Sequence, residues 1–209
     1  MAEPDLNRRP IATRGSAWAQ RLASALSKTS ITPNQISMLS VLFAGIGAAL
    51  LAWAPTPVGL LLCALCVQLR LICNLIDGMV AVEGGKGSVT GRIYNEFPDR
   101  ITDSLLIVAL GYACGYAWLG WLGALLAVAT AYVRVFGGSL GLAQDFRGPL
   151  AKAQRIAVLT VACVAAAAEM FWHPQRYALL GAAAIIAVGS ALTCVTRTRA
   201  IAAQLRAQA

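Results

Sequence analysis

Six apolar runs dominate the pattern of hydrophobic and polar positions along the chain. They cover residues 34–54, 57–81, 97–117, 119–140, 153–171 and 177–195. Each run is close to the roughly 20 residues that an α-helix needs to cross a bilayer, and only short segments separate the runs. The pattern therefore predicts an all-α integral membrane fold with six transmembrane helices.

The composition and the distribution of charge agree with a membrane protein. Of the 209 residues, 58% are hydrophobic and 12% are charged, and the mean hydropathy is +0.68, which is too apolar for a soluble domain of this size. Most Lys and Arg residues lie on the side that holds both termini, which predicts that this side is cytoplasmic. The net charge of +8 then reflects topology and attraction to anionic membrane lipid, and we expect no nucleic-acid partner.

An amphipathic pattern precedes the first run. Trp18, Leu22 and Leu26 recur at helical spacing within residues 15–28, which predicts an interfacial helix on the cytoplasmic leaflet. A basic, flexible tail is the alternative interpretation. The chain then divides into a cytoplasmic tail with the interfacial helix, a six-helix membrane domain and a C-terminal cytoplasmic tail, at residues 1–33, 34–195 and 196–209.

Three other features are not expected to carry chemistry. The six cysteines all fall within apolar runs and are interpreted as small buried hydrophobic residues without a disulfide, because Cys63 and Cys66 have no second pair or nearby histidine for zinc. The stretch EGGKGS at 83–88 lacks the order of a phosphate-binding loop and is interpreted as a flexible turn. His173 beside Trp172 is typical of an interfacial anchor.

Two polar helix faces meet across one loop. The faces consist of Arg70, Asn74, Asp77 and Ala81, and of Glu96, Asp99, Arg100 and Asp103. Carboxylates at membrane depth must be neutralised, either by ion pairs with the two arginines or by hard divalent cations, which take oxygen ligands. Three or four acids against two arginines leave negative charge uncompensated, which favours a metal site.

The same segment resembles the signature of the CDP-alcohol phosphatidyltransferase family of integral membrane enzymes. That signature reads D-x-x-D-G-x-x-A-R, a short spacer, then G-x-x-x-D-x-x-x-D. The stretch ITPNQIS at 31–37 is also similar to the Thr-Pro-Asn start of the family. The resemblance covers nearly the whole chain and implies six spans with an N-terminal interfacial helix. The matching signature residues are Asp77, Gly78, Ala81, Asp99 and Asp103.

The departures from the signature are specific. Asn74 stands where the first aspartate belongs, Val82 replaces the arginine, and Asn95 takes the place of the second glycine. In the family, four aspartates hold two divalent ions and the last one is the general base. An asparagine keeps an oxygen ligand but removes a negative charge, so Glu96 is the expected substitute and Glu83 the weaker one.

The resemblance implies a reaction and a set of roles. A phosphatidyl group passes from CDP-diacylglycerol to the hydroxyl of an alcohol or polyol phosphate, and CMP is released, in phospholipid biosynthesis. Asp103 is the expected catalytic base. Small residues at the nucleotide site permit close approach of CDP, although helix packing also explains them. The expected ligands of two Mg²⁺ or Mn²⁺ ions are Asn74, Asp77, Glu96, Asp99 and Asp103, and the expected nucleotide-binding residues are Asn74, Asp77, Gly78 and Ala81.

A second basic segment, RGPLAKAQR at 147–155, lies on the same predicted side. Lys152 and Arg155 at a helix start, with Arg134 behind them, are candidates for binding an acceptor phosphate. The topology signal alone would place the same charges there. Together these features predict a cytoplasmic active site in a protein of the bacterial inner (plasma) membrane.

Two other functions stay open. A degenerate family member would bind nucleotide or lipid without turnover, and Asn74, Val82 and Asn95 favour it. A transporter would carry acids midway through a span, whereas these acids gather at the predicted cytoplasmic ends. Small residues in the spans favour a homodimer.

Overall fold

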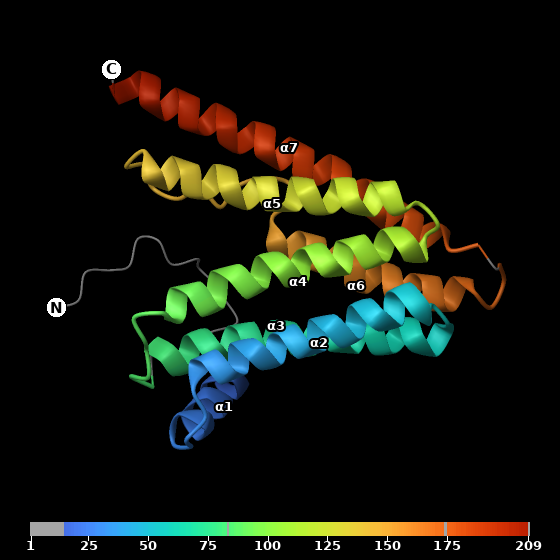
Figure 1. Ribbon diagram of the computed structural model, residues 1–209, viewed down its shortest axis with the longest axis horizontal. Coiled ribbons are helices and arrows are strands. Elements are labelled where there is room, and N and C mark those ends of the chain that lie inside the picture. The colour runs from blue at the N-terminus through green and yellow to red at the C-terminus, as the bar shows by residue number, and fades with distance from the viewer. Residues whose placement is uncertain (1–14, 83, 174, 209) are drawn as a thin grey trace.

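The computed structural model describes residues 15–82, 84–173 and 175–208, and within them all regular secondary structure is α-helical. The all-α class is therefore confirmed. The long helices lie roughly along one common axis (Figure 1). The helices are α1 (Ala17–Ser27), α2 (Pro33–Trp53), α3 (Pro57–Val82), α4 (Gly91–Ala113), α5 (Ala117–Ser139), α6 (Lys152–Glu169) and α7 (Tyr177–Gln208).

Four of these helices are long and apolar enough to cross a membrane, namely α2, α3, α5 and α7. The helices α4 and α6 match the other two apolar runs, but charged residues in both lower their hydropathy. The number of spanning helices therefore stays a prediction. Helix α7 continues to Gln208, so most of the segment predicted as a C-terminal tail is helical.

The six long helices pack as a closed ring. Helix α2 contacts α3 and α4, α3 contacts α6, α4 contacts α5, and α7 contacts both α5 and α6. Fully buried residues such as Leu60, Leu110 and Ile186 belong to one core cluster that draws on all six helices. The ring thus encloses a single apolar core.

Helix α1 lies outside the ring against α3 (Figure 1). Its buried face is formed by Ala19 and Ala23, at 0% and 3% exposure. Of the predicted apolar face, Trp18 and Leu22 are exposed, whereas Leu26 is half-buried and packs against the protein. A helix is therefore present in the predicted segment, and its amphipathic, interfacial character stays a prediction.

The Thr-Pro-Asn stretch is the start of α2. Thr32 is the N-cap: its hydroxyl accepts from the Gln35 amide at 3.3 Å, and the Gln35 side chain accepts from the Thr32 amide at 2.9 Å. Pro33 occupies the first turn, where no amide hydrogen is needed. This capping box fixes where α2 begins and hence which way Ser37 faces.

The ends of the helices sort into two groups (Figure 1). The start of α2, the loop between α3 and α4, the end of α5 and the C-terminus lie at one end. The short turns that join α2 to α3 and α4 to α5 lie at the other. The residues with sequence-predicted roles on α3 and α4 therefore lie toward the first end.

Candidate functional site

A buried arginine links the two polar helix faces. The side chain of Arg70 on α3 is fully buried, at 0% exposure. Its Nη2 donates to Oδ1 of Asp103 at 2.7 Å and to Oδ1 of Asp99 at 3.2 Å, and its Nε donates to the Thr102 hydroxyl at 3.1 Å. One guanidinium thus connects α3 with three side chains of α4.

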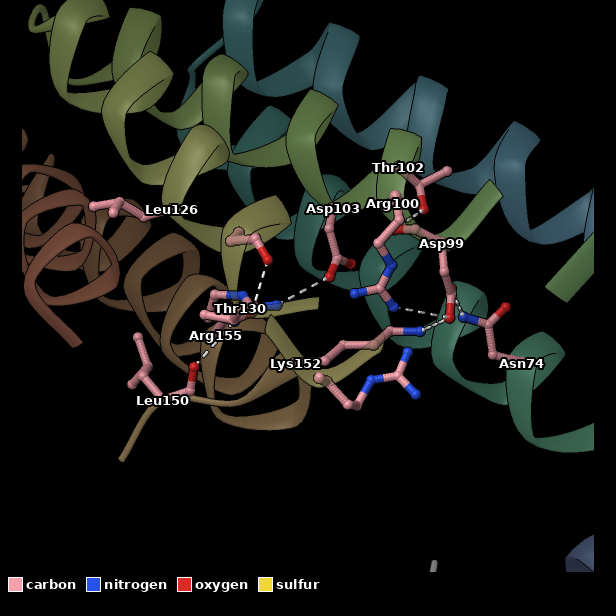
Figure 2. Close-up of polar contacts among 12 residues, drawn as sticks. Asn74, Asp99, Arg100, Thr102, Asp103, Leu126, Thr130, Leu150, Lys152 and Arg155 are labelled. Atoms are coloured by element: carbon pink, nitrogen blue, oxygen red, sulfur yellow. Dashed lines mark hydrogen bonds and ion pairs between the residues drawn. The ribbon is translucent and has the colours of Figure 1, made fainter. Parts of the chain in front are cut away.

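Asp99 has partners on both carboxylate oxygens (Figure 2). Besides the bond from Arg70, its Oδ1 accepts a hydrogen bond from Nδ2 of Asn74 at 2.8 Å. Its Oδ2 accepts from the ammonium of Lys152 on α6 and lies 3.9 Å from Nη2 of Arg100. The protein itself therefore supplies the positive charge around this carboxylate.

Asp103 accepts a hydrogen bond through one oxygen and is ion-paired through the other. Arg70 holds its Oδ1, whereas its buried Oδ2 accepts no hydrogen bond and lies 3.5 Å from Nη2 of Arg155 in an ion pair (Figure 2). Arg155 is itself buried, at 2% exposure, and donates to the Leu150 carbonyl at 3.0 Å. The Oδ2 atom of Asp103 is therefore an acceptor without a donor.

Helical spacing explains these contacts. Arg70 and Asn74 lie one turn apart on α3, so both reach Asp99; Asp99 and Asp103 lie one turn apart on α4, so both face α3. The contacts agree with a shared face for Arg70 and Asn74 and for Asp99 and Asp103, whereas Asp77 and Glu96 have other partners. The contact between Thr102 and Arg70 was not predicted, because nothing in the sequence around Thr102 marks it as part of the site.

Asp77 lies apart from these pairs. It is 3% exposed, and its Oδ2 accepts a hydrogen bond from the Ser37 hydroxyl of α2 at 2.5 Å. Its buried Oδ1 has no hydrogen-bond partner. Its interactions with Asp99 and Lys152 are electrostatic. Sequence reasoning missed Ser37, although the α2 capping stretch contains it.

Glu96, the expected substitute acid, has two arginine partners. It forms an ion pair with Arg134 of α5 and lies 3.7 Å from Nε of Arg100. Its side chain is 44% exposed, so these pairs are partly screened by solvent. Arg134 also binds Gln144 and lies over the Phe146 ring at 5.3 Å. Glu96 is therefore already engaged by protein cations.

The expectation that only two arginines face these acids was wrong. Lys152 and Arg155 of α6 and Arg134 of α5 also form ion pairs with them. The sequence suggested a surplus of negative charge because these three residues are remote from the acids along the chain. Charge balance alone therefore does not require a metal ion.

The donor chemistry nevertheless fits a hard divalent ion. Among the residues with described side chains, no three Asp, Glu, His or Cys groups are gathered closely enough to hold a metal. Yet Asp77 Oδ1 and Asp103 Oδ2 are buried oxygens without hydrogen-bond partners, and an unpaired buried carboxylate oxygen is costly unless a cation reaches it. Each of these two oxygens offers a ligand of the kind that such an ion takes.

The remaining predicted residues continue along α3. Gly78 and Ala81 are half-buried and Val82 is exposed. Glu83, the weaker substitute acid, lies outside the described residues. The following loop is not helical, and Lys86 ties it to the carbonyls of Thr29 and Ile31 before α2. The stretch predicted as a turn is therefore held against the start of α2.

The loop that carries the second basic segment is fastened to α7. The Leu150 amide donates to the Thr193 hydroxyl at 3.0 Å. Arg197, which is 4% exposed, donates to the Arg147 carbonyl at 2.8 Å and to the Thr130 carbonyl at 2.7 Å. Sequence analysis gave Thr193 no role and assigned Arg197 to a tail. These contacts fix the start of α6, and with it Lys152.

Asp145 in this loop pairs with its neighbour. Nε and Nη2 of Arg147 donate to its two oxygens, each at 3.0 Å. Desolvation raises the pKa of Asp145, but the hydrogen bonds and charge of Arg147 outweigh it, so the pKa lies below its ordinary value. The Asp145–Arg147 ion pair therefore stabilises the loop at neutral pH, and this stabilisation is lost as the pH falls through the lowered pKa of Asp145. Because Arg147 is largely exposed, the stabilisation is small.

Comparison with known proteins decides the family. No family model matches the chain. The chain is, however, 33% identical over 190 residues to the archaetidylinositol phosphate synthase of Aeropyrum pernix, which covers 90% of this chain and 92% of that protein. It belongs to the CDP-alcohol phosphatidyltransferase family. A second relative in this comparison, the phosphatidylinositol phosphate synthase of Streptomyces avermitilis, is 28% identical over 185 residues, which cover 84% of this chain and 74% of that protein.

Solved structures share the fold of this phosphatidyltransferase. The phosphatidylinositol phosphate synthase of Mycobacterium tuberculosis with CDP-DAG bound superposes with a TM-score of 0.72 at 20% identity, over 89% of this chain and 94% of that one. The same enzyme in complex with manganese and citrate gives a TM-score of 0.71 at 20% identity, over 88% of each chain. At this identity the likeness shows the fold.

The hold of α7 on the basic loop is testable with a matched pair of variants. Thr193→Val leaves the buried Leu150 amide without an acceptor, which costs about 1–3 kcal/mol. We expect a lower thermal unfolding temperature in detergent and faster hydrogen exchange at Leu150. Thr196→Val is the control, because both hydroxyls donate to the carbonyl one turn earlier but only that of Thr193 accepts from another segment. Equal stability of the two variants would contradict the contact.

Proposed function

We propose that the protein transfers a phosphatidyl group from CDP-diacylglycerol to a hydroxyl of a phosphorylated polyol and releases CMP, as a step of phospholipid biosynthesis. Its family membership makes it a CDP-alcohol phosphatidyltransferase. One observation supports the proposal beyond the family: the half-buried Asp99 and the buried Asp103 meet the cations Lys152 and Arg155 toward one end of the helix ring.

Asp103 is the proposed general base. A base must offer a free acceptor atom to the hydroxyl proton, and Oδ2 of Asp103 accepts no hydrogen bond, whereas Arg70 fixes Oδ1. The hydroxyl oxygen attacks the phosphorus that bears the lipid, the bond from that phosphorus to CMP breaks, and Asp103 receives the proton. Arg70 thus orients the carboxylate without occupying the reacting oxygen.

The donor site is proposed along α3. Asn74, Asp77 and Asp103 offer oxygen ligands for a divalent ion, Mg²⁺ or Mn²⁺, which when bound neutralises a diphosphate and stabilises the leaving group. The mycobacterial enzyme solved with manganese supports the use of a divalent ion, and the one solved with CDP-DAG supports the donor. Gly78 and Ala81 offer little side-chain bulk beside Asp77, so the nucleotide can approach the helix.

The acceptor site is proposed at the start of α6. Lys152, Arg155 and Arg134 are cations that can bind a phosphate. The side chain of Lys152 is 17% exposed while that of Arg155 is 2% exposed, so Lys152 is the first of these two to meet an arriving phosphate. The names of the two relatives make an inositol phosphate the first acceptor to test.

We place the protein in the membrane with six spans. Helices α4 and α6 complete the ring that the four strongly apolar helices begin, and their charged starts then lie at the cytoplasmic surface with both termini. Helix α1 lies in the interface, where its exposed Trp18 and Leu22 contact lipid. We keep the proposed division of the chain into a cytoplasmic tail with the interfacial helix (1–33), a membrane domain (34–195) and a C-terminal tail (196–209). Location in the inner membrane and assembly as a homodimer stay predictions.

A degenerate family member is the second candidate. Asn74 in place of an aspartate favours it, and so do the protein cations on both oxygens of Asp99. Such a protein would bind CDP-diacylglycerol but never release CMP. A transporter is not favoured, because its acids would line a path midway through the spans.

The role of Asp103 separates an enzyme from a binding protein. Purified protein is incubated with CDP-diacylglycerol, Mg²⁺ or Mn²⁺ and a panel of alcohols and polyol phosphates, and CMP is measured. We expect release by the wild type and a loss of about 100-fold or more in Asp103→Asn, because a general base contributes that much, with CDP-lipid binding nearly unchanged. Asp145→Asn, in the loop outside the site, is the control. If the wild type binds the CDP-lipid but releases no CMP with any acceptor, the protein is the degenerate, non-catalytic family member.

The role of Lys152 appears in the acceptor dependence. Lys152→Ala removes a charge-assisted hydrogen bond to phosphate, so the KM for a phosphorylated acceptor should rise about tenfold or more. The KM for an unphosphorylated alcohol and the affinity for the CDP-lipid should change little. Lys86→Ala, which alters a lysine of the α3–α4 loop instead, is the matched control. An equal rise for both kinds of acceptor would remove Lys152 from the phosphate site.

A further inference from the structure

The position of Arg70 resembles that of a bound metal ion. Its guanidinium carries one positive charge, is fully buried, and contacts oxygens of Asp99, Asp103 and Thr102. Two carboxylates and a hydroxyl are the oxygen donors that a hard divalent ion takes. Arg70 comes from α3 and all three oxygens from α4, so the guanidinium bridges the helices as a shared ion would.

Asn74 and Arg70 form a coupled pair. They lie one turn apart on α3, and both donate to the same oxygen of Asp99. An aspartate with a divalent ion has a net charge of +1, and an asparagine with an arginine has the same net charge. Asn74 with Arg70 one turn earlier on the same helix face therefore gives the site the same net charge as an aspartate with a divalent ion.

The carboxylate oxygens of the site differ in how far protein cations engage them. Both oxygens of Asp99 are taken by Arg70, Asn74 and Lys152. The buried carboxylate oxygens without a hydrogen bond are Asp77 Oδ1 and Asp103 Oδ2, among the described side chains. In the part of the chain that the structure describes, Asp77 Oδ1 thus has neither a hydrogen bond nor an ion pair, whereas Arg155 lies 3.5 Å from Asp103 Oδ2 and protein groups engage both oxygens of Asp99.

We infer that Arg70 is a built-in cation that replaces one of two divalent ions, so that the site binds a single exchangeable divalent ion. Nη1 of Arg70 is buried and has no hydrogen-bond partner, so no acceptor of the protein offsets the charge there, and the guanidinium can attract the diphosphate of the CDP-lipid electrostatically. The inference rests on the proposed function only in taking this site to be one for a divalent ion.

The number of bound Mn²⁺ ions tests the inference without substrate or turnover. Purified protein in detergent is titrated with Mn²⁺, and free Mn²⁺ is counted by electron paramagnetic resonance. We expect one ion per chain for the wild type. The double variant Arg70→Gln, Asn74→Asp removes the guanidinium and restores the acid, and we expect it to bind two ions.

Matched variants separate the role of Arg70 from a general effect of charge. Arg100→Gln with Asn74→Asp removes another arginine near Asp99 but leaves Arg70 in place, so the count should stay at one. Size-exclusion chromatography and thermal unfolding check that each variant is folded. If the double variant does not fold, the number of Mn²⁺ ions bound by the wild type still tests the inference.

Two ions, or none, on the wild type would overturn the inference, and so would a count of one on a folded Arg70→Gln, Asn74→Asp variant. The CMP assay is a separate measurement. Absence of CMP release with one bound Mn²⁺ would contradict the proposed function alone, whereas CMP release with two bound ions would contradict this inference alone.

Discussion

The site depends on the ion pairs that Arg70 makes with Asp99 and Asp103. Carboxylates within a membrane helix are costly unless a cation neutralises them and hydrogen bonds hold that cation in place. Arg70 does both from the facing helix, and it is fully buried while doing so. Arg70 is the cation that joins both carboxylates to α3, so the contact fixes α3 against α4 and thereby constrains where the other groups of the site can lie.

The rest of the ring completes this arrangement from two directions. From α2, the capped start of the helix brings Ser37 to Asp77. From the other side, α7 holds the loop before α6 through Thr193 and Arg197, which places Lys152 beside Asp99. The proposed donor-binding face thus rests on α2 and α3, whereas the proposed acceptor-binding cations rest on α5, α6 and α7. A transferase needs both groups of residues in one place, and the closed ring provides that.

Much of the fold and part of the site could be predicted from the sequence. Apolar runs and helical spacing act over short distances along the chain, so the helices and the shared face of Arg70 and Asn74 were accessible. Contacts between remote segments were not. Nothing in the spacing indicated that Lys152 reaches Asp99 or that Arg134 reaches Glu96, which is why the charge balance was misjudged. The end of α7 was missed for a related reason, because a helix can continue beyond the apolar stretch that reveals it.

The most direct test of this account is an experimental structure with CDP-diacylglycerol and Mn²⁺, in which anomalous scattering locates the manganese. The account predicts one manganese peak per chain, in contact with Asp77, and the guanidinium of Arg70 between Asp99 and Asp103. Two peaks bridged by Asp99, with Arg70 turned away from both carboxylates, would contradict it.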